Sequence, residues 1–229
     1  PANTKPVEYF FNSKQQLSTT RESGANSFDE YISDPNKPVP YTNGIYARRN
    51  NDYMAEDQRF ASLRTDVLFY ETPELTEDVT LAGKILADLR VSLTGTDADF
   101  VVKLIDVLPE SEPNFKNAPR GFQMAGYERL VRAEVFRGKF RNSFEKPEPF
   151  EPGKISTVKF DLNDVAHTFK KGHRIMIQVQ SSWFPLVDRN PQKFMQIPDA
   201  KEADFQKATI RVYHDAANAS KIVLPVLMK

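Results

Sequence analysis

The sequence predicts an all-β fold, either a sandwich of two sheets or a jelly roll. About nine short segments have the alternation or the β-branched residues of strands, and hardly any segment has helical periodicity. Turns that contain many of the 16 prolines, together with Asn and Gly residues, separate these segments. No repeat of roughly 20–50 residues is visible, which disfavours propellers and solenoids. Because the composition has no break, we expect residues 1–229 to form a single domain.

The first half of the chain contains four expected strands and a proline-rich strap. The strap covers residues 33–41, SDPNKPVPY, where prolines remove backbone donors and favour an extended surface segment. Residues 79–94 alternate clearly, and residues 100–108 form the next expected strand. The polar turn at residues 95–99 predicts that the two pair as a hairpin. The other two strands are expected at residues 7–11 and 67–70.

The second half contains five further expected strands. The clearest covers residues 174–180, where Ile175, Ile177 and Val179 alternate with other residues. This period of two predicts a half-buried strand. We expect a single helical turn at residues 164–169. The other strands are expected at residues 127–136, 155–162, 208–213 and 221–226.

The clearest strand leads directly into a loop that contains the only tryptophan of the chain. Trp183 and Phe184 lie in the sequence Ser-Ser-Trp-Phe-Pro, and Asp188, Arg189 and Asn190 follow shortly after. The end of a strand places these side chains at one end of a sandwich, where they can leave the core. We expect these five residues to form a contact surface in which Arg189 pairs with a carboxylate. In the alternative, both rings fold back into the core of this chain and Arg189 pairs locally.

Composition excludes several functional classes. The chain has 31 Lys and Arg and 31 Asp and Glu residues, so it lacks the basic excess of a nucleic-acid-binding domain. Without cysteine it has no disulfide and no thiolate metal site. Its apolar runs are far shorter than a membrane span, so we expect no membrane partner. The sequence assigns no compartment, because periplasmic, secreted and cytoplasmic locations are all compatible with it.

No residue pattern predicts a catalytic site or a cofactor. The serine elbow G-x-S-x-G is absent, and His167, His173 and His214 have no nearby serine or carboxylate pattern that would bring them together. Asp97 and Asp99 alternate in the segment GTDAD as in a calcium loop, but the other ligands of such a loop are missing. We interpret this segment as a solvated hairpin turn and expect no metal there.

Five segments carry a resemblance to a known family. They are SDPNKPVPY, DQRFASLRTDVLFYETPELTEDVTLAG, TGTDADFVVKLIDVLP, YERLVRAEVFRGKFRNSFEKPEPFEPG and FKKGHRIMIQVQSSWFPLVDRNPQ. In this order they resemble the C-terminal domain of the X-Pro dipeptidyl-peptidase and cocaine-esterase group of serine hydrolases. Within that group the likeness is to the α-amino-acid ester hydrolases, also called acyl esterases or glutaryl acylases. It covers nearly the whole chain.

The resemblance implies a jelly-roll β-sandwich with a galactose-binding-like fold, whose first strand is truncated in this chain. It also implies that this domain follows an α/β-hydrolase domain, which contains the catalytic triad. Because nothing here matches the serine elbow, the resemblance implies no catalytic residue in this chain. We therefore expect a non-catalytic domain that packs on the catalytic domain of the same polypeptide and supports the active-site shape or homo-oligomer assembly.

The alternative is a stand-alone carbohydrate-binding module, because a galactose-binding-like fold does not by itself specify a ligand. The two hypotheses differ in the surface that they require. A contact surface should be a broad apolar patch, whereas a sugar site should be a concave aromatic platform with polar rims.

Overall fold

Eleven strands provide nearly all the regular structure of residues 3–228, the part of the chain that the computed structural model describes. They are β1 (Thr4–Asn12), β2 (Gln16–Ser18), β3 (Phe28–Ser33), β4 (Leu68–Glu71), β5 (Val79–Leu93), β6 (Asp99–Val107), β7 (Glu128–Arg137), β8 (Ser156–Phe169), β9 (Arg174–Gln180), β10 (Ala208–Tyr213) and β11 (Lys221–Leu227). The helical segments are α1 (Arg59–Ser62) and the 3-10 turns η1 (Asp52–Met54), η2 (Gly138–Phe140), η3 (Ile197–Asp199) and η4 (Glu202–Asp204). None of these helices is long and apolar enough to cross a membrane. The predicted all-β class is confirmed.

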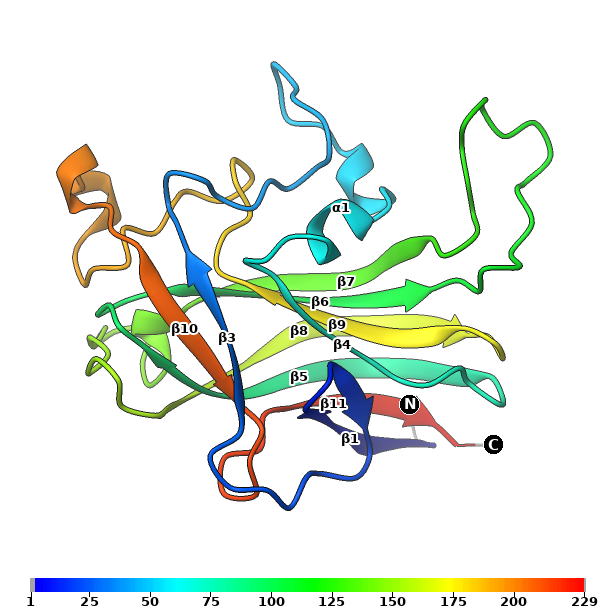
Figure 1. The fold of residues 1–229 in the computed structure, drawn as a ribbon, viewed down its shortest axis with the longest axis horizontal. Coiled ribbons are helices and arrows are strands. Elements are labelled where there is room, and N and C mark those ends of the chain that lie inside the picture. Colours follow the sequence, from blue (N-terminus) through cyan, green and yellow to red (C-terminus); the bar gives the residue numbers. More distant parts are fainter. Residues whose placement is uncertain (1–2, 229) are drawn as a thin grey trace.

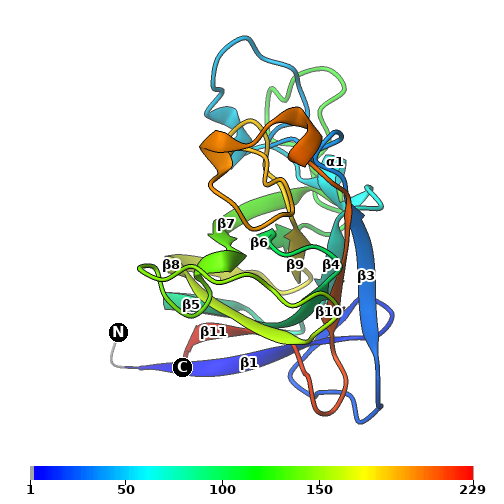
Figure 2. The same ribbon diagram turned by 90° about the vertical axis from the view of Figure 1, so that its left-hand side faces the viewer.

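Hydrogen bonds join the strands into one path that curls into two facing layers (Figures 1 and 2). One layer has the order β4-β9-β6-β7, and the other has the order β8-β5-β11-β1. Strand β2 links the layers between β1 and β4, and β10 and β3 extend from one end of β5. The edge strand of one layer is β7 and that of the other is β8, and these two strands do not pair, which makes a sandwich with one closed and one open side.

The hairpin predicted for residues 79–94 and 100–108 is wrong. Strand β5 pairs with β8, β10 and β11, whereas β6 pairs with β7 and β9. The connection therefore crosses from one layer to the other. Its residues Asp97 and Ala98 are buried, so it is not the solvated tight turn that a hairpin requires. Alternation along a strand predicts which side chains share a face, but it does not determine which neighbour the strand pairs with.

The helical turn predicted at residues 164–169 is also wrong, because β8 continues through it and pairs with the first part of β5. Asn163 has a left-handed φ of 63°, and the pairing register shifts between Lys84 and Leu86. The strand thus passes a bulge and resumes. Pairing with a long neighbouring strand outweighs the weak local preference of the segment Asp-Val-Ala-His.

A continuous apolar core fills the space between the two layers. Phe11 and Tyr70 stack in it with ring centroids 4.3 Å apart, near the closed side of the sandwich. Ile175, Ile177 and Val179 of β9 all lie in this core, as their alternation predicts. Burying each such side chain contributes about 1.5–3 kcal/mol to stability, so this core supplies most of the force that holds the layers together.

Strand β9 is predicted to be half-buried, but both of its faces are covered. Met176, Gln178 and Gln180 are also buried, on the face opposite the core. Residues 34–66 and 182–187 pack over this face, and we call them the loop layer. The predicted strap at residues 33–41 belongs to it and forms no strand ladder beyond Ser33; its backbone meets the Trp183 loop at the bridge between Pro40 and Phe184.

Candidate contact surface

Trp183 lies inside the molecule, between the sheet and the loop layer. It is only 7% exposed and packs with Tyr41, Tyr53 and Val101. Its ring meets that of Tyr53 edge to face, at 5.6 Å and 86°. The ammonium nitrogen of Lys103 lies 5.6 Å from the centroid of the indole ring. Trp183 therefore anchors the loop layer on β6, and its ring does not form the exposed platform that a sugar site would need.

Phe184, the next residue, is 38% exposed. Its backbone is held on both sides by the proline-rich strap: its N–H donates to the Val39 carbonyl at 3.0 Å, and its carbonyl accepts from the Tyr41 N–H at 2.9 Å. The peptide bond between Phe184 and Pro185 is cis. The loop thus presents one aromatic ring to solvent from a backbone that is fixed in place.

The charged residues Asp188 and Arg189 both pair within this chain. Asp188 accepts a hydrogen bond from the Arg137 guanidinium at 2.5 Å, and its side chain remains 55% exposed. Arg189 donates to the Pro35 carbonyl at 3.1 Å and to Glu202 at 3.3 Å. These contacts hold the loop to the end of the strap and to η4.

Asn190 belongs to a buried polar cluster at the crossing between β5 and β6. Its side-chain amide donates to Asp97 at 3.2 Å and to Asp99 at 2.8 Å. Asp99 also accepts two hydrogen bonds from Arg137, at 3.0 and 3.1 Å. Burial, with the nearby Asp99 carboxylate as a second cause, raises the pKa of Asp97 to about 6. The solvated turn predicted here is therefore wrong. Within residues 3–228, no group of three or more His, Cys, Asp or Glu residues is arranged to hold a metal ion.

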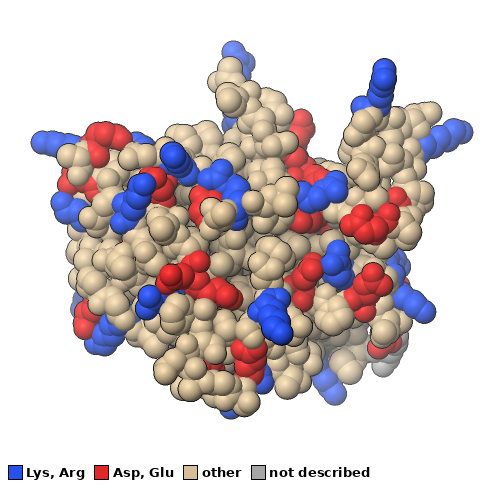
Figure 3. Space-filling model, in the orientation of Figure 1, with Lys and Arg blue, Asp and Glu red and all other residues tan. Residues whose placement is uncertain are grey.

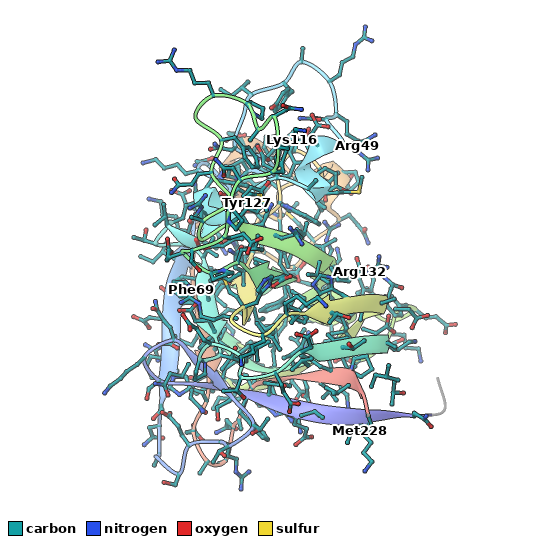
Figure 4. All side chains as sticks on the ribbon, turned by 90° about the vertical axis from the view of Figure 1, so that its right-hand side faces the viewer. Arg49, Phe69, Lys116, Tyr127, Arg132 and Met228 are labelled. Carbon is teal, nitrogen blue, oxygen red and sulfur yellow. The ribbon has the colours of Figure 1, made fainter. Side chains whose placement is uncertain are left out.

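The outer surface of the loop layer, which we call the loop face, projects beyond the sheets (Figure 1). It contains a hollow of about 250 Å³, lined by Tyr41, Tyr46, Ala47, Arg48, Arg49, Pro185 and Leu186. Large apolar side chains stand exposed there: Ile45 fully, and Tyr46 and Met54 by about half. Figure 3 shows Lys and Arg side chains at the tips of the projecting loops, and Figure 4 places Arg49 and Lys116 at this end of the molecule.

Two buried ionisable residues, Lys103 and Glu128, lie beneath the loop layer. Lys103 of β6 is fully buried, and its ammonium group donates to the Gln58 side chain at 3.0 Å. Glu128 accepts hydrogen bonds from Ser62 at 2.8 Å and from Gln178 at 3.1 Å. Burial lowers the pKa of Lys103 to about 7 and raises the pKa of Glu128 to about 7. Through these separate hydrogen bonds the two residues join the loop layer to β6, β7 and β9, and their shifted pKa values make that junction sensitive to pH.

The fold brings two histidines together although the sequence shows no pattern for this. His167 Nε2 lies 3.0 Å from one oxygen of Asp106, and His173 Nδ1 lies 2.7 Å from the other. His214 lies apart from them and bonds Glu22 at 3.0 Å. The buried Asp106 thus ties β6 to β8 and to the turn before β9. No serine hydroxyl of the described residues bonds to any of the three rings, and the carboxylates that the rings do contact belong to segments far away in sequence.

The sequence analysis missed Lys103 and Asp106, although a signal for both was present. They interrupt the otherwise apolar strand sequence FVVKLIDV. A charge inside a strand buried on both faces requires partners from other segments. Gln58 and Glu128 could not be found in this way, because they lie in ordinary polar surroundings along the chain.

Comparison with known proteins gives consistent matches. The sequence pattern of the family described as the X-Pro dipeptidyl-peptidase C-terminal non-catalytic domain matches residues 1–223. The cocaine esterase of Rhodococcus sp. (strain MB1 Bresler) is 35% identical over 211 residues, which are 92% of this chain and 34% of the esterase. This chain therefore spans about a third of the length of that relative.

Two solved structures are similar to this chain in both sequence and fold. An aminopeptidase from the marine sediment archaeon Thaumarchaeota archaeon is 39% identical with a TM-score of 0.90, over 98% of this chain and 37% of the aminopeptidase. An α-amino acid ester hydrolase is 40% identical with a TM-score of 0.87, over 96% of this chain and 36% of the hydrolase.

Proposed function

The chain belongs to the family of X-Pro dipeptidyl-peptidase C-terminal non-catalytic domains, and from this premise we propose that it packs on a serine-hydrolase catalytic domain of the same polypeptide. In this role it supports the shape of the active site. The proposal extends to residues 1–229 as one domain, which the pairing of β1 with β11 and the single main core support.

We propose the loop face as the contact surface, and the observation that carries this proposal is its exposed apolar area. Ile45, Tyr46, Met54 and Phe184 each leave a large part of an apolar side chain in water. Several large apolar side chains exposed on one layer of loops are typical of a surface that contacts another protein. Trp183 and Asn190, which we expected to share in the contact through their side chains, instead hold the loop in position from inside.

Two arginines, Arg48 and Arg49, line the hollow of the loop face together with Tyr46. Within residues 3–228, Arg48 and Arg49 have no hydrogen-bond acceptor and no ion-pair partner, in contrast to Arg137 and Arg189. Unpaired arginines beside an apolar patch are suited to pair with carboxylates of a partner when the patch is covered.

The contact is tested by placing charges on the loop face. In a polypeptide that contains this chain and the proposed catalytic domain, Ile45→Asp combined with Tyr46→Asp should lower hydrolase activity at least about tenfold, because a buried unpaired carboxylate weakens an interface. The matched control is Ile32→Asp, which changes an exposed isoleucine on β3. Activity is measured with p-nitrophenyl esters and X-Pro anilides, and unfolding of the 229-residue chain alone should be unaffected by either change. Equal activity in both variants would contradict the proposed surface.

The chain by itself should have no esterase or aminopeptidase activity, because it lacks a serine elbow. We expect hydrolysis of p-nitrophenyl esters and X-Pro anilides by the purified chain at the rate of buffer alone. A serine-directed inhibitor provides the check: turnover that copurifies with the chain and disappears with the inhibitor would place a nucleophile in this domain.

A further inference from the structure

The open side of the sandwich contains a cavity that is distant in the fold from the loop face. Strands β7 and β8 face each other there as the edge strands of the two layers, and no strand pairing joins them (Figure 2). Side chains bridge them instead: Arg132 Nε donates to the Leu162 carbonyl at 2.8 Å, and Asn163 donates to Glu134 at 2.8 Å. Beyond these bridges, toward η2, the gap widens into a cavity of about 440 Å³.

Phenylalanine side chains provide the apolar walls of this cavity. Phe136 of β7 stacks on Phe160 of β8, with centroids 5.0 Å apart and planes within 10°. Phe144 stands nearly perpendicular to Phe136, at 6.0 Å and 78°, and stacks with Phe140. Phe144 is nevertheless 77% exposed. The Phe144 ring is therefore held in place by its neighbours while most of its surface remains in water. Such a ring can form one wall of a binding site, and a bound ligand would bury it.

The charges that line the cavity differ in whether they are already engaged. Arg141 donates to the carbonyls of Gly138, Glu148 and Pro149 and stacks over Phe150. Glu134 accepts from Asn163 and from a backbone N–H, and Asp161 pairs with Lys84. Lys159 is the one charged lining residue that has no hydrogen-bond or ion-pair partner within residues 3–228.

We propose that this cavity binds a small aromatic anion, with its ring against Phe136 and Phe144 and its carboxylate paired with Lys159. The volume of the cavity lies in the range of small-molecule sites, roughly 300–1,000 Å³. Aromatic walls favour a planar ring, and an unpaired ammonium group selects a negative charge over a positive one. The same chemistry belongs to a free aromatic acid and to the carboxyl-terminal residue of a peptide ending in phenylalanine.

The test measures binding of 2-naphthoate to the 229-residue chain by calorimetry or by amide chemical shifts. We expect a Kd on the order of 1 mM, as is usual for a ligand of this size. Phe144→Ala should weaken binding at least about fivefold through loss of one wall, and Lys159→Gln about threefold through loss of the ion pair. The neutral analogue 2-naphthalenemethanol should bind the native chain about as weakly as 2-naphthoate binds the Lys159→Gln variant.

Matched controls are available in the loop between β6 and β7. Phe115 and Lys116 are also exposed, and Phe115→Ala and Lys116→Gln should leave the affinity unchanged. Acetyl-Gly-Gly-Phe, tested in parallel, distinguishes the two ligand sources: tighter binding than 2-naphthoate, with the same losses in the variants, assigns the site to a peptide terminus.

Absence of binding at ligand concentrations up to 10-fold above the expected Kd would overturn the proposal, and so would equal affinity of the native chain and the Phe144→Ala variant. A third contrary result would be a native dimer that binds neither probe and becomes monomeric on Phe144→Ala. The last result would assign the cavity to contact between two copies of the chain. None of these outcomes depends on a catalytic domain, so the proposed function is tested separately.

Discussion

Replacing Lys103 with methionine is expected to stabilise the folded chain at pH 6 and to have little effect, or a small opposite one, at pH 10. The native ammonium group is fully buried, and Gln58 is its single hydrogen-bond acceptor among residues 3–228. Burial lowers the pKa of Lys103 from 10.5 to about 7. The folded chain therefore holds fewer protons than the unfolded chain between these values, and stability rises with pH across that window. Between pH 6 and pH 10, the difference in free energy of unfolding between the native chain and the Lys103→Met variant should change by about 4 kcal/mol.

Glu128 should make the stability of the folded chain change with pH in the opposite direction, at lower pH. Burial raises its pKa from 4.5 to about 7, so the folded chain holds more protons than the unfolded chain in that interval. Stability should then fall as the pH rises through it, which places a minimum of stability near pH 7 for the two groups together. Glu128→Gln should remove the fall, and Lys103→Met should remove the rise.

These slopes are measured by urea unfolding of the native chain and both variants at intervals between pH 4.5 and pH 10. Differences between variant and native curves cancel the contributions of the other titrating groups, such as Asp97. Parallel curves for the native chain and Lys103→Met would show that Lys103 is not held in a buried, poorly paired state.

Trp183→Ala is expected to destabilise the chain by about 4 kcal/mol, as removal of a buried aromatic ring usually does. The ring fills the space between Tyr53, Val101 and the ammonium group of Lys103, so its loss leaves a cavity beneath the loop layer. Phe184→Ala should cost less than about 1 kcal/mol in the same chain, because that ring is already 38% exposed.

The two neighbouring substitutions therefore separate the structural from the contact role of this loop. Unfolding of both variants is followed by circular dichroism, since Trp183→Ala removes the only tryptophan. In a polypeptide with the proposed catalytic domain, Phe184→Ala should lower activity more than its small effect on stability explains. Equal destabilisation by the two substitutions would contradict the assignment of Trp183 to the core.

Local patterns in the sequence predicted much of the strand content. Nine of the eleven strands were expected, and β2 and β3 were missed because they are short or lie beside a polar stretch. In the candidate contact loop, the sequence could not tell which side chains are buried in this chain. Trp183 and Asn190 share a loop with Phe184, but the structure buries the first two and exposes the third.

The sequence by itself determined that this chain is all-β and which side chains of β9 face the core. Ile175, Ile177 and Val179 alternate, and alternation requires that they share one face of a strand. Only the tertiary structure decided that the opposite face is buried as well, that β5 and β6 lie in different layers, and that Lys103 meets Gln58. The physical reason is that backbone geometry relates neighbours along the chain, whereas the covering of a face or a charge depends on segments far away in sequence. Those segments are selected by the packing and hydrogen bonds of the whole fold.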